Sequence, residues 1–277
     1  MDFADDSRGC LPAMEDKMRV LVRGSGDVAS AVAHRLFCLG HAVLIHEIAQ
    51  PTYTRRGMAF TDAVFDGKID LAGVWAKCPP TRADLQRMLA CRRAIPVSTA
   101  AFEDALQLMR PDVLVDARMR KRWMPEGQIG LAPLSIGLGP NFNAGVNVDV
   151  AIETAWGDSL GRILHAGATL PLAGEPREID GVGRERCVYA PQAGVLHSLV
   201  GIGDWVEAGE QVALLNGQAI CAPLSGHVRG ICHAAVPVTM GSKILEIDPR
   251  RDCAAIFGLG ERPLRIAEAV VRAMHGQ

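Results

Sequence analysis

Residues 190–194 (APQAG), in the second half of the chain, are repeated 32 residues later as residues 222–226 (APLSG). The same offset relates five further pairs of similar positions: Leu196 and Val228, Leu199 and Ile231, Val206 and Val238, Gly209 and Gly241, and Val212 and Ile244. Two copies of such a short, strand-rich unit cannot each bury a core alone. We therefore expect the copies to intertwine in one small β domain.

The first copy reads as a turn, a short strand and a second turn over residues 203–210 (GDWVEAGE). This layout resembles the barrel-sandwich hybrid of lipoyl and biotinyl domains, which we expect over residues 188–250. Those domains present a lysine on the hairpin between their halves, here residues 214–219, where Asn216-Gly217 predicts a type I′ turn. The hairpin has no lysine, and Lys243, the only lysine in this half, lies away from it. We expect no covalent lipoate or biotin, and a docking or lid role for the domain.

The first half alternates strand and helix patterns. Residues 19–23 (RVLVR) predict a strand that leads into residues 24–29 (GSGDVA), after which apolar residues recur at helical spacing as far as Gly40. A second strand over residues 42–45 ends in His46-Glu47. Because the alternation continues, we expect a Rossmann-like domain over residues 18–166, with a parallel sheet covered by helices.

The loop after the first strand has the G-x-G-x-x-A form of a dinucleotide site. In such a site Gly24 permits the tight turn, Gly26 lets a pyrophosphate approach, and Ala29 allows close packing of helix and sheet. Glu47 is placed to bind a ribose diol. The candidate cofactor-binding residues of the loop are Gly24, Ser25, Gly26, Asp27, Val28 and Ala29, and the candidate cofactor is NAD(P) or another nucleotide. The alternative is a turn without a ligand, because the charge of Asp27 opposes a phosphate there.

Other candidate residues follow further predicted strands. They are Arg55 and Arg56, Gly139 and Asn141, and, as catalytic candidates, Asp116 and Lys121. The two adjacent arginines would clamp a phosphate or carboxylate, or else lie in an ordinary solvated loop. Because the carboxyl ends of parallel strands share one edge, we expect a ligand cleft at that edge.

Composition bears on the partners, the cellular location and the metal binding that we expect of the chain. The formal net charge is −2 and no block of Lys or Arg forms a phosphate track, so we expect no nucleic-acid partner. No apolar run approaches the roughly 18–20 residues that span a bilayer, so we expect no membrane partner. Eight cysteines without a C-x-x-C pair favour reduced thiols and a cytoplasmic location. No Cys or His spacing matches a known metal site.

We expect a disordered leader over residues 1–17, a linker over 167–187 and a C-terminal helix over 251–277.

Several motifs follow one another along the chain: RGSGDVA at 23–29, EIAQPT at 47–52, RR at 55–56, LVDA at 114–117, LGP at 138–140, AG at 144–145, IET at 152–154, LGR at 160–162, the two A-P-x-x-G copies, and IDPR at 247–250. In this order they resemble the selenium-dependent molybdenum hydroxylase accessory family, often called YqeB-like, over nearly the whole chain after residue 18. The chain departs from that family at Arg23, where the family tends to have lysine, and at residues 155–159 (AWGDS), where the family commonly has basic groups.

The resemblance implies a cytoplasmic accessory factor for molybdenum hydroxylases related to xanthine dehydrogenase. Such a factor would act in maturation or cofactor insertion, with a molybdopterin species as a further candidate ligand and the hydroxylase as client. Two other interpretations stay open. One is an NAD(P)-dependent oxidoreductase acting on a small molecule, and the other is a non-catalytic interaction scaffold. A homo-oligomer is compatible with each of them.

Overall fold

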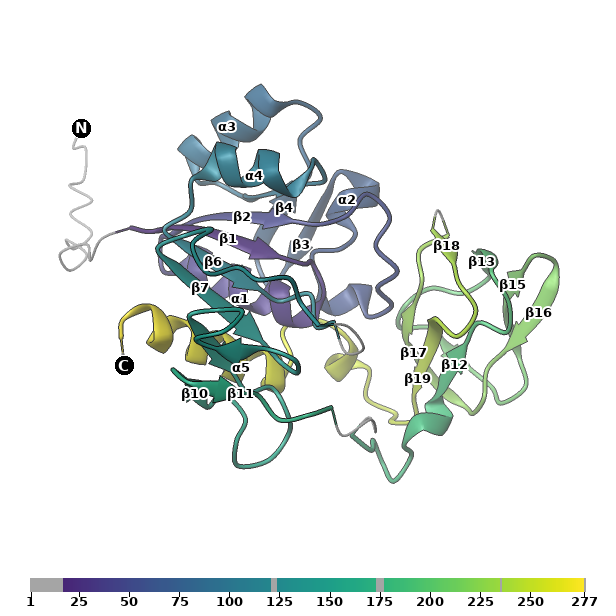
Figure 1. Cartoon of the computed structure of the whole chain (residues 1–277). Coiled ribbons are helices and arrows are strands. Elements are labelled where there is room, and N and C mark those ends of the chain that lie inside the picture. The colour runs from purple at the N-terminus through teal and green to yellow at the C-terminus, as the bar shows by residue number, and fades with distance from the viewer. Residues whose placement is uncertain (1–16, 121–123, 173–176, 235, 277) are drawn as a thin grey trace, which may run out of the picture.

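The computed structural model describes residues 17–120, 124–172, 177–234 and 236–276. These residues form a larger α/β domain and a smaller β domain (Figure 1). The mixed α/β class expected from the sequence is confirmed by a large sheet with flanking helices and by additional antiparallel sheets. Residues 1–16 of the expected leader lie outside the described residues.

The α/β domain is built on a nine-stranded sheet in the order β10-β9-β7-β6-β1-β2-β5-β4-β3. The strands are β1 Arg19–Arg23, β2 Ala42–His46, β3 Lys68–Leu71, β4 Val74–Lys77, β5 Ile95–Ser98, β6 Val113–Asp116, β7 Leu134–Leu138, β9 Val150–Ile152 and β10 Ile163–Leu164. Within it, the order β5-β2-β1-β6-β7-β9 is that of a doubly wound sheet, whose direction of winding changes between β1 and β6.

The expected all-parallel sheet is wrong at both edges, where β3 pairs antiparallel with β4 and β10 pairs antiparallel with β9. The physical reason at one edge is a tight hairpin. Ala72 and Gly73, which join β3 to β4, have φ angles of +50° and +82°. Two successive positive φ angles are typical of a type I′ turn, and such a turn returns the chain alongside itself. A two-stranded sheet of β8 (Asn143–Ala144) and β11 (Gly167–Ala168) lies outside the large sheet.

Helices cover both faces of the large sheet. They are α1 Asp27–Cys38, α2 Ala63–Asp66, α3 Arg82–Cys91, α4 Phe102–Met109 and α5 Glu261–Met274, with short 3-10 helices η1 Arg56–Met58, η2 Arg184–Arg186 and η3 Ala254–Ile256. α1 and α5 share one apolar core with the sheet, and α3 and α4 share another on the opposite face. Among the described residues no helix combines the length and apolar character needed to cross a bilayer.

The last helix belongs to the first domain. The expected C-terminal helix over 251–277 begins only at Glu261, and its buried residues Ile266, Val270 and Ala273 join the core that contains α1 (Figure 1). The two ends of the described chain therefore build one domain, and the β domain is inserted between them. The expected linker over 167–187 also has folded ends. Gly167 and Ala168 pair with β8, and Arg186 is 2% exposed.

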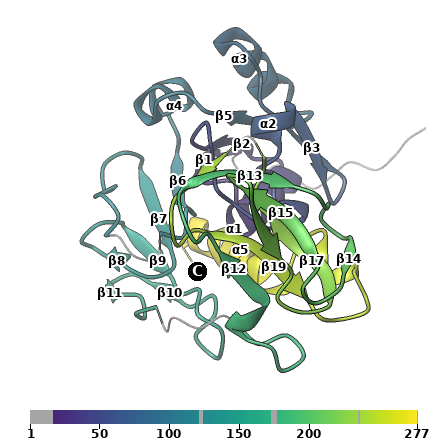
Figure 2. The same cartoon turned by 90° about the vertical axis from the view of Figure 1, so that its right-hand side faces the viewer.

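The β domain contains two four-stranded antiparallel sheets, β12-β19-β17-β14 and β16-β15-β13-β18. Its strands are β12 Cys187–Tyr189, β13 Gly194–Ser198, β14 Trp205–Val206, β15 Gln211–Leu215, β16 Gln218–Cys221, β17 Gly226–Ile231, β18 Pro237–Val238 and β19 Lys243–Asp248. In each sheet a strand of the first copy pairs with a strand of the second, β14 with β17 and β13 with β18, so the expected intertwining is confirmed; Figure 2 shows β14 beside β17.

The repeat also explains the core of the β domain. Three of the matched pairs are buried: Leu196 and Val228, Val206 and Val238, and Val212 and Ile244. One matched pair is not equivalent, since Leu199 is 50% exposed whereas Ile231 is 1% exposed. Between the copies, Asn216 and Gly217 have φ angles of +49° and +83°. This agrees with the expected type I′ turn.

Candidate functional site

The glycine loop of residues 24–29 lies at the carboxyl end of β1, where the winding of the sheet reverses. Gly24 has φ +103°, and a Cβ at this position would lie 3.2 Å from the backbone oxygen of Ala117. The amide of Gly24 donates to the carbonyl of His46 at 2.8 Å. Glycine is therefore required here by the turn and by the close approach of the segment that follows β6.

Glu47 binds the loop itself. The amide and the hydroxyl of Ser25 both donate to Oε2 of Glu47, at 2.8 Å and 2.9 Å. The amide of Ile48 donates to Oε1 at 2.8 Å. Both carboxylate oxygens thus accept hydrogen bonds from the protein. In this arrangement Glu47 stabilises the turn, whereas the sequence had predicted that it would hold a ribose.

Tyr53 covers the start of α1. Its hydroxyl accepts a hydrogen bond from the amide of Asp27 at 3.0 Å, and a Cβ on Gly26 would lie 2.8 Å from its ring. The amide of Val28 donates to Oδ1 of Asp27 at 2.8 Å. Burial, with a smaller contribution from the Asp27 charge, raises the pKa of Tyr53 well above its usual value. Because these donors are already used, a pyrophosphate does not fit the glycine loop while Tyr53 is in place.

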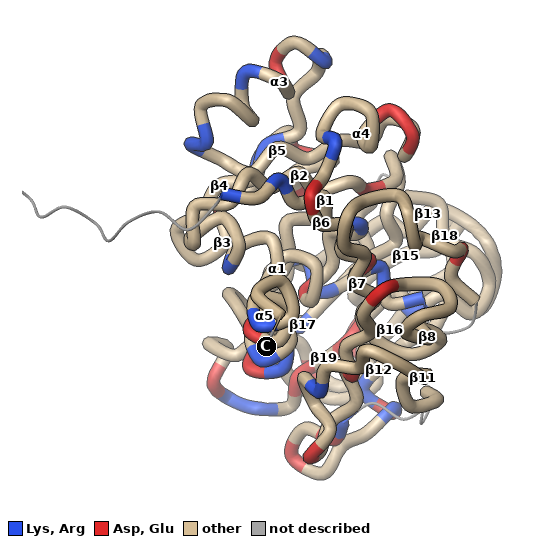
Figure 3. The backbone as a smooth tube through the Cα atoms, turned by 60° about the vertical axis from the view of Figure 1, so that its left-hand side comes forward, with Lys and Arg blue, Asp and Glu red and all other residues tan. Residues whose placement is uncertain are grey.

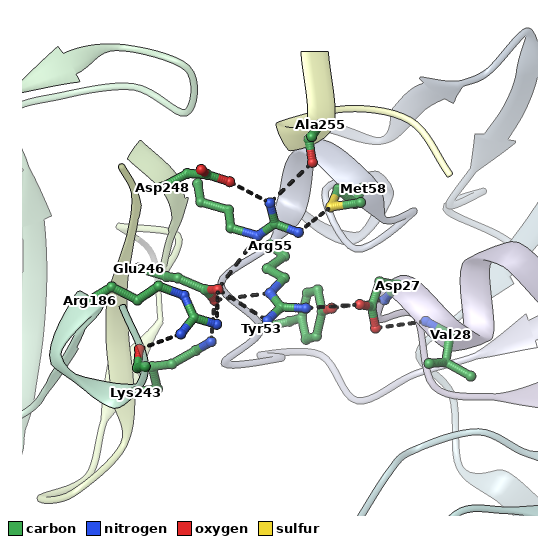
Figure 4. A network of polar contacts seen from close by, with 12 residues as sticks. Asp27, Val28, Tyr53, Arg55, Met58, Arg186, Lys243, Glu246, Asp248 and Ala255 are labelled. Carbon is green, nitrogen blue, oxygen red and sulfur yellow. Dashed lines mark hydrogen bonds and ion pairs between the residues drawn. The ribbon is translucent and has the colours of Figure 1, made fainter. Parts of the chain in front are cut away.

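Arg55 and Arg56 bind the β domain instead of facing a cleft. Arg55 lies between the two domains, with Nη1 3.4 Å from Oδ2 of Asp27 and Nε 2.9 Å from Oε2 of Glu246 (Figure 4). Arg56 donates from Nε to the carbonyl of Ile231 at 2.9 Å and from Nη1 to Asp62 at 2.6 Å. The sequence-based hypothesis was a clamp on a phosphate or carboxylate, whereas in this structure the partners of both guanidinium groups are protein groups.

Glu246 is the centre of this interdomain network. It is fully buried, and besides Arg55 it contacts Lys243 and lies 3.5 Å from both Arg186 and Arg229. Burial raises the pKa of a carboxyl group, but the charges of Arg55 and Lys243 outweigh this and hold the pKa of Glu246 well below its usual range. Figure 3 shows acidic and basic positions interspersed around β17 and β19. Glu246 is therefore ionised and joins four cations.

Main-chain contacts attach the same segment to the β domain. The amide of Ile231 donates to the carbonyl of Thr54 at 3.0 Å. A Cβ on Gly230 would lie 2.8 Å from that carbonyl oxygen, so only glycine allows this approach. The thiol of Cys232 lies 3.6 Å from the carbonyl of Thr52. Residues 52–56, which we call the bridging segment, therefore contact β17, the cysteine that follows it and β19, and insert Tyr53 into the glycine loop.

A second polar cluster lies at the ends of the central strands. Arg23, the last residue of β1, pairs in register with His46 of β2 and with Asp116 of β6. Side chains at paired positions of a parallel sheet point to the same face. His46 and Arg23 both contact the ring of Phe102, at 5.4 Å and 3.7 Å from its centroid. Arg23, His46 and Asp116, which we call the polar row, therefore face the side of the sheet covered by α4.

Asp116, a catalytic candidate, is 1% exposed. Nε of Arg118 donates to its Oδ1 at 3.0 Å, and the amide of Gln128 donates to its Oδ2 at 2.5 Å. Lys121, its proposed partner, lies outside the described residues. Asp116 is thus a buried anchor for Arg118.

Glu126 joins the arginines of this cluster. Its carboxylate lies 2.8 Å from Nη2 of Arg23, 2.9 Å from Nη2 of Arg118 and 3.3 Å from Nη1 of Arg120. Partial burial raises its pKa, but a backbone hydrogen bond and the charges of Arg118 and Arg23 together lower it to about 2. Burial lowers the pKa of His46, and the Arg23 charge adds to this.

Gly139 and Asn141 lie beside this cluster. The side-chain amide of Asn141 donates to the carbonyl of Arg120 at 3.3 Å. Asn141 has φ +73°, and Gly139 has φ +97° with Met119 and Thr154 close to where its Cβ would be. Both residues therefore shape the loop after β7 next to the arginine-bearing segment, which agrees with the expected shared edge.

Two of the clefts on the described surface bear on the site. The larger of these two, of about 630 Å³, is lined by Trp156, Asp158 and Arg177 together with Glu261 and Arg265 at the start of α5. The smaller, of about 390 Å³, lies between α3, α4 and residues 98–100. Because Ser98 pairs in register with His46, the smaller cleft is the one that adjoins the polar row.

No family model matches the chain. It is 35% identical over 255 residues to the uncharacterized protein YqeB of Escherichia coli strain K12. The alignment covers 92% of this chain and 47% of the relative, so the chain spans about half the length of the curated relative it matches. The similarity supports a YqeB-like chain. Because the relative is uncharacterized, it supplies no activity.

Two solved structures show a distant similarity. One is an aspartoacylase family protein from Mesorhizobium loti, 13% identical, with a TM-score of 0.25 over 76% of this chain and 58% of that chain. The other is the ectoine utilization protein EutE (DoeB) of Ruegeria pomeroyi, 15% identical, with a TM-score of 0.25 over 83% and 85%. At such TM-scores the similarity carries no argument about this chain.

Proposed function

We propose that this chain is a cytoplasmic accessory factor for the maturation of molybdenum hydroxylases of the xanthine dehydrogenase type. It holds a nucleotide or pterin-type cofactor at the carboxyl edge of the large sheet and docks its client through the β domain. The observation that carries the proposal is the bridging segment. It places the side chain of Tyr53 in the glycine loop and connects Tyr53 to the β domain through the contact of Arg55 with Glu246.

The bridging segment supports a dependence of ligand access on the β domain. The Tyr53 hydroxyl occupies the amide of Asp27 at the start of α1, while Arg55 two residues later contacts the buried Glu246 of β19. A client that shifts the β domain pulls on the segment and withdraws Tyr53 from the loop. Release of a ligand on contact with a partner is what a factor that hands over a cofactor requires.

The β domain has the features of a docking element. Its two sheets exchange strands between the copies of the repeat, which supports a lipoyl-like barrel-sandwich hybrid. The turn at Asn216-Gly217 has no lysine, and the ammonium of Lys243 binds Glu246. Without a carrier lysine at its exposed turn, the domain is suited to protein contact and not to covalent carriage of lipoate or biotin.

The NAD(P)-dependent oxidoreductase is less well supported. A dinucleotide enzyme needs open amide donors at the glycine loop. Here Tyr53, Glu47 and Asp27 accept from those amides. The residues of the loop therefore fit a pyrophosphate only after Tyr53 moves.

The test in cells is deletion of the gene in its own host, followed by assay of the host's molybdenum hydroxylase. The proposal expects loss of hydroxylase activity, restored by the wild-type gene. It also expects poor restoration by Arg55→Met, which separates the bridging segment from Glu246. Arg19→Met is the matched control, because Arg19 is the first residue of β1, outside the bridging segment, and among the described side chains it pairs only with Asp112. Fully active hydroxylases in the deletion strain would refute the proposal.

The second test is native mass spectrometry of the protein from its own host, followed by identification of released small molecules. A retained nucleotide or molybdopterin species, lost in Gly26→Val, would place cofactor handling at the glycine loop. Gly127→Val is the control, since a Cβ at Gly127 meets nothing within 4 Å. A protein that comes off empty and does not bind NAD, CTP or pterin would favour the interaction scaffold.

A further inference from the structure

Arg23 is a buried arginine whose donors are only partly used. It is 4% exposed, and Nη2 contacts Oε1 of Glu126 at 2.8 Å. Within the described part of the chain, Nε and Nη1 make no hydrogen bond, and Nη1 lies 3.7 Å from Oδ2 of Asp116. Burying a guanidinium with free donors is unfavourable, since each N–H loses its water without gaining an acceptor. The unused N–H groups of Arg23 can therefore donate hydrogen bonds to a further anionic oxygen.

Two more arginines surround the same point. Arg118 and Arg120 both contact Glu126, whose side chain is 46% exposed, whereas the side chain of Arg23 is only 5% exposed. The guanidinium of Arg23 is thus the buried group of this cluster, and the Glu126 carboxylate contacts it from the solvent side. Asp116 is already bound by Arg118 and Gln128. Three arginines against two carboxylates leave one positive charge in excess.

The Glu126 carboxylate is the kind of group that an external carboxylate or phosphate could replace. Arginine binds carboxylate and phosphate through the same forked geometry. Glu126 lies on the connection between β6 and β7, which has no helix or strand in its described residues. A half-exposed carboxylate on an irregular connection can leave the arginines, whereas Arg23 is fixed by its place in β1 and by the ring of Phe102.

We propose that Arg23, Arg118 and Arg120 form a binding site for a phosphate group, esterified or free, which the carboxylate of Glu126 fills in this structure. The site rests on the proposed function in that it supplies the anion-binding part of the sheet-edge ligand site. It differs from the glycine loop in position and in chemistry, because it uses arginine side chains and lies on the opposite face of the sheet from α1.

The experiment is a titration of the purified full chain with inorganic phosphate and, separately, with phenyl phosphate and cytidine monophosphate, by isothermal calorimetry. Glu126→Gln removes the competing charge without altering a buried position. It should bind all three probes about tenfold tighter than wild type, the change equivalent to about 1.4 kcal/mol. Arg23→Met and Arg118→Met should lose binding, and Arg19→Met should bind as wild type. If Arg23→Met does not fold, Arg118→Met and Glu126→Gln carry the test.

The probes separate two sources of the phosphate. Tighter binding of cytidine monophosphate than of inorganic phosphate supports a phosphorylated cofactor, and equal binding supports the free anion. Unchanged or weaker binding in Glu126→Gln, or wild-type binding in Arg118→Met, would overturn the proposal. Because these titrations involve no hydroxylase, a failure here leaves the deletion experiment informative. Phosphate binding with a fully active deletion strain would refute the proposed function alone.

Discussion

Replacing Glu246 by glutamine removes the one charge that the buried cations of the interdomain network share. The amide keeps the shape and an acceptor for Arg55, but Arg186, Arg229 and Lys243 lose their common anion. Arg229 keeps Asp248 and Arg55 keeps Asp27, so among the described residues Arg186 is the cation left buried without an anion. Breaking a buried ion pair from one side costs about 3–5 kcal/mol, because the remaining charge stays buried without compensation. For a chain of this size that corresponds to a decrease in Tm of roughly 6–20 °C.

The assay is thermal and urea unfolding followed by circular dichroism, with Glu268→Gln as the matched control. Glu268 pairs with Arg35 at 2.7 Å, but their side chains are 45% and 38% exposed. An exposed pair contributes about 1 kcal/mol or less. If Glu246→Gln costs no more than Glu268→Gln, the network is not held by charge and the reasoning is wrong.

The pH dependence of this effect follows from the sign of the pKa shift. The pKa of Glu246 is lower in the folded protein than its ordinary value of 4.5. The stabilisation is therefore fully present above pH 4.5 and is lost as the pH falls below it. The difference between wild type and Glu246→Gln should be constant from pH 8 to about 5 and should shrink in more acidic solution.

Three further outcomes are expected. Tyr53→Phe leaves the Asp27 amide without its acceptor, and unfolding experiments should show a loss of about 1–2 kcal/mol; an unchanged stability would mean that the hydroxyl does not cap α1. Gly230→Ala places a methyl group 2.8 Å from the Thr54 carbonyl oxygen and should cost about 1–3 kcal/mol, with Gly127→Ala as the neutral control. His46 should titrate below its ordinary pKa of 6.5 when its imidazole is followed by NMR, so that stability falls as the pH drops below 6.5 and falls less steeply in His46→Gln.

The sequence predicted features set by local chemistry. The 32-residue repeat predicted strand exchange between two sheets, and the offset holds for β13 and β17, for β14 and β18, and for β15 and β19. The glycine loop was placed correctly because Gly24 needs a positive φ that few other residues adopt. Such features depend on neighbours a few residues away, which is why a single sequence reveals them.

The features that the sequence did not reveal depend on partners far along the chain. Arg55 meets Glu246 across 191 residues, and no local pattern links a loop arginine to a buried glutamate in another domain. α5 has an amphipathic pattern, but nothing in it predicts that it packs beside α1. Tyr53 lay within the segment singled out for its arginines, yet its contact with Gly26 emerges only when the turn is folded.

The two charged centres differ in a way that suggests different roles. In the interdomain network Glu246 is fully buried, and its carboxylate is surrounded by cations from β17, β19, η2 and the bridging segment. In the cluster that Glu126 forms with Arg23, Arg118 and Arg120, the arginine at the centre is the buried group. There the carboxylate of Glu126 contacts Arg23 from the solvent side. A buried anion cannot be exchanged without separating the domains, whereas a half-exposed carboxylate can be replaced by another anion. The first arrangement therefore suits a connection between domains, and the second suits a ligand site.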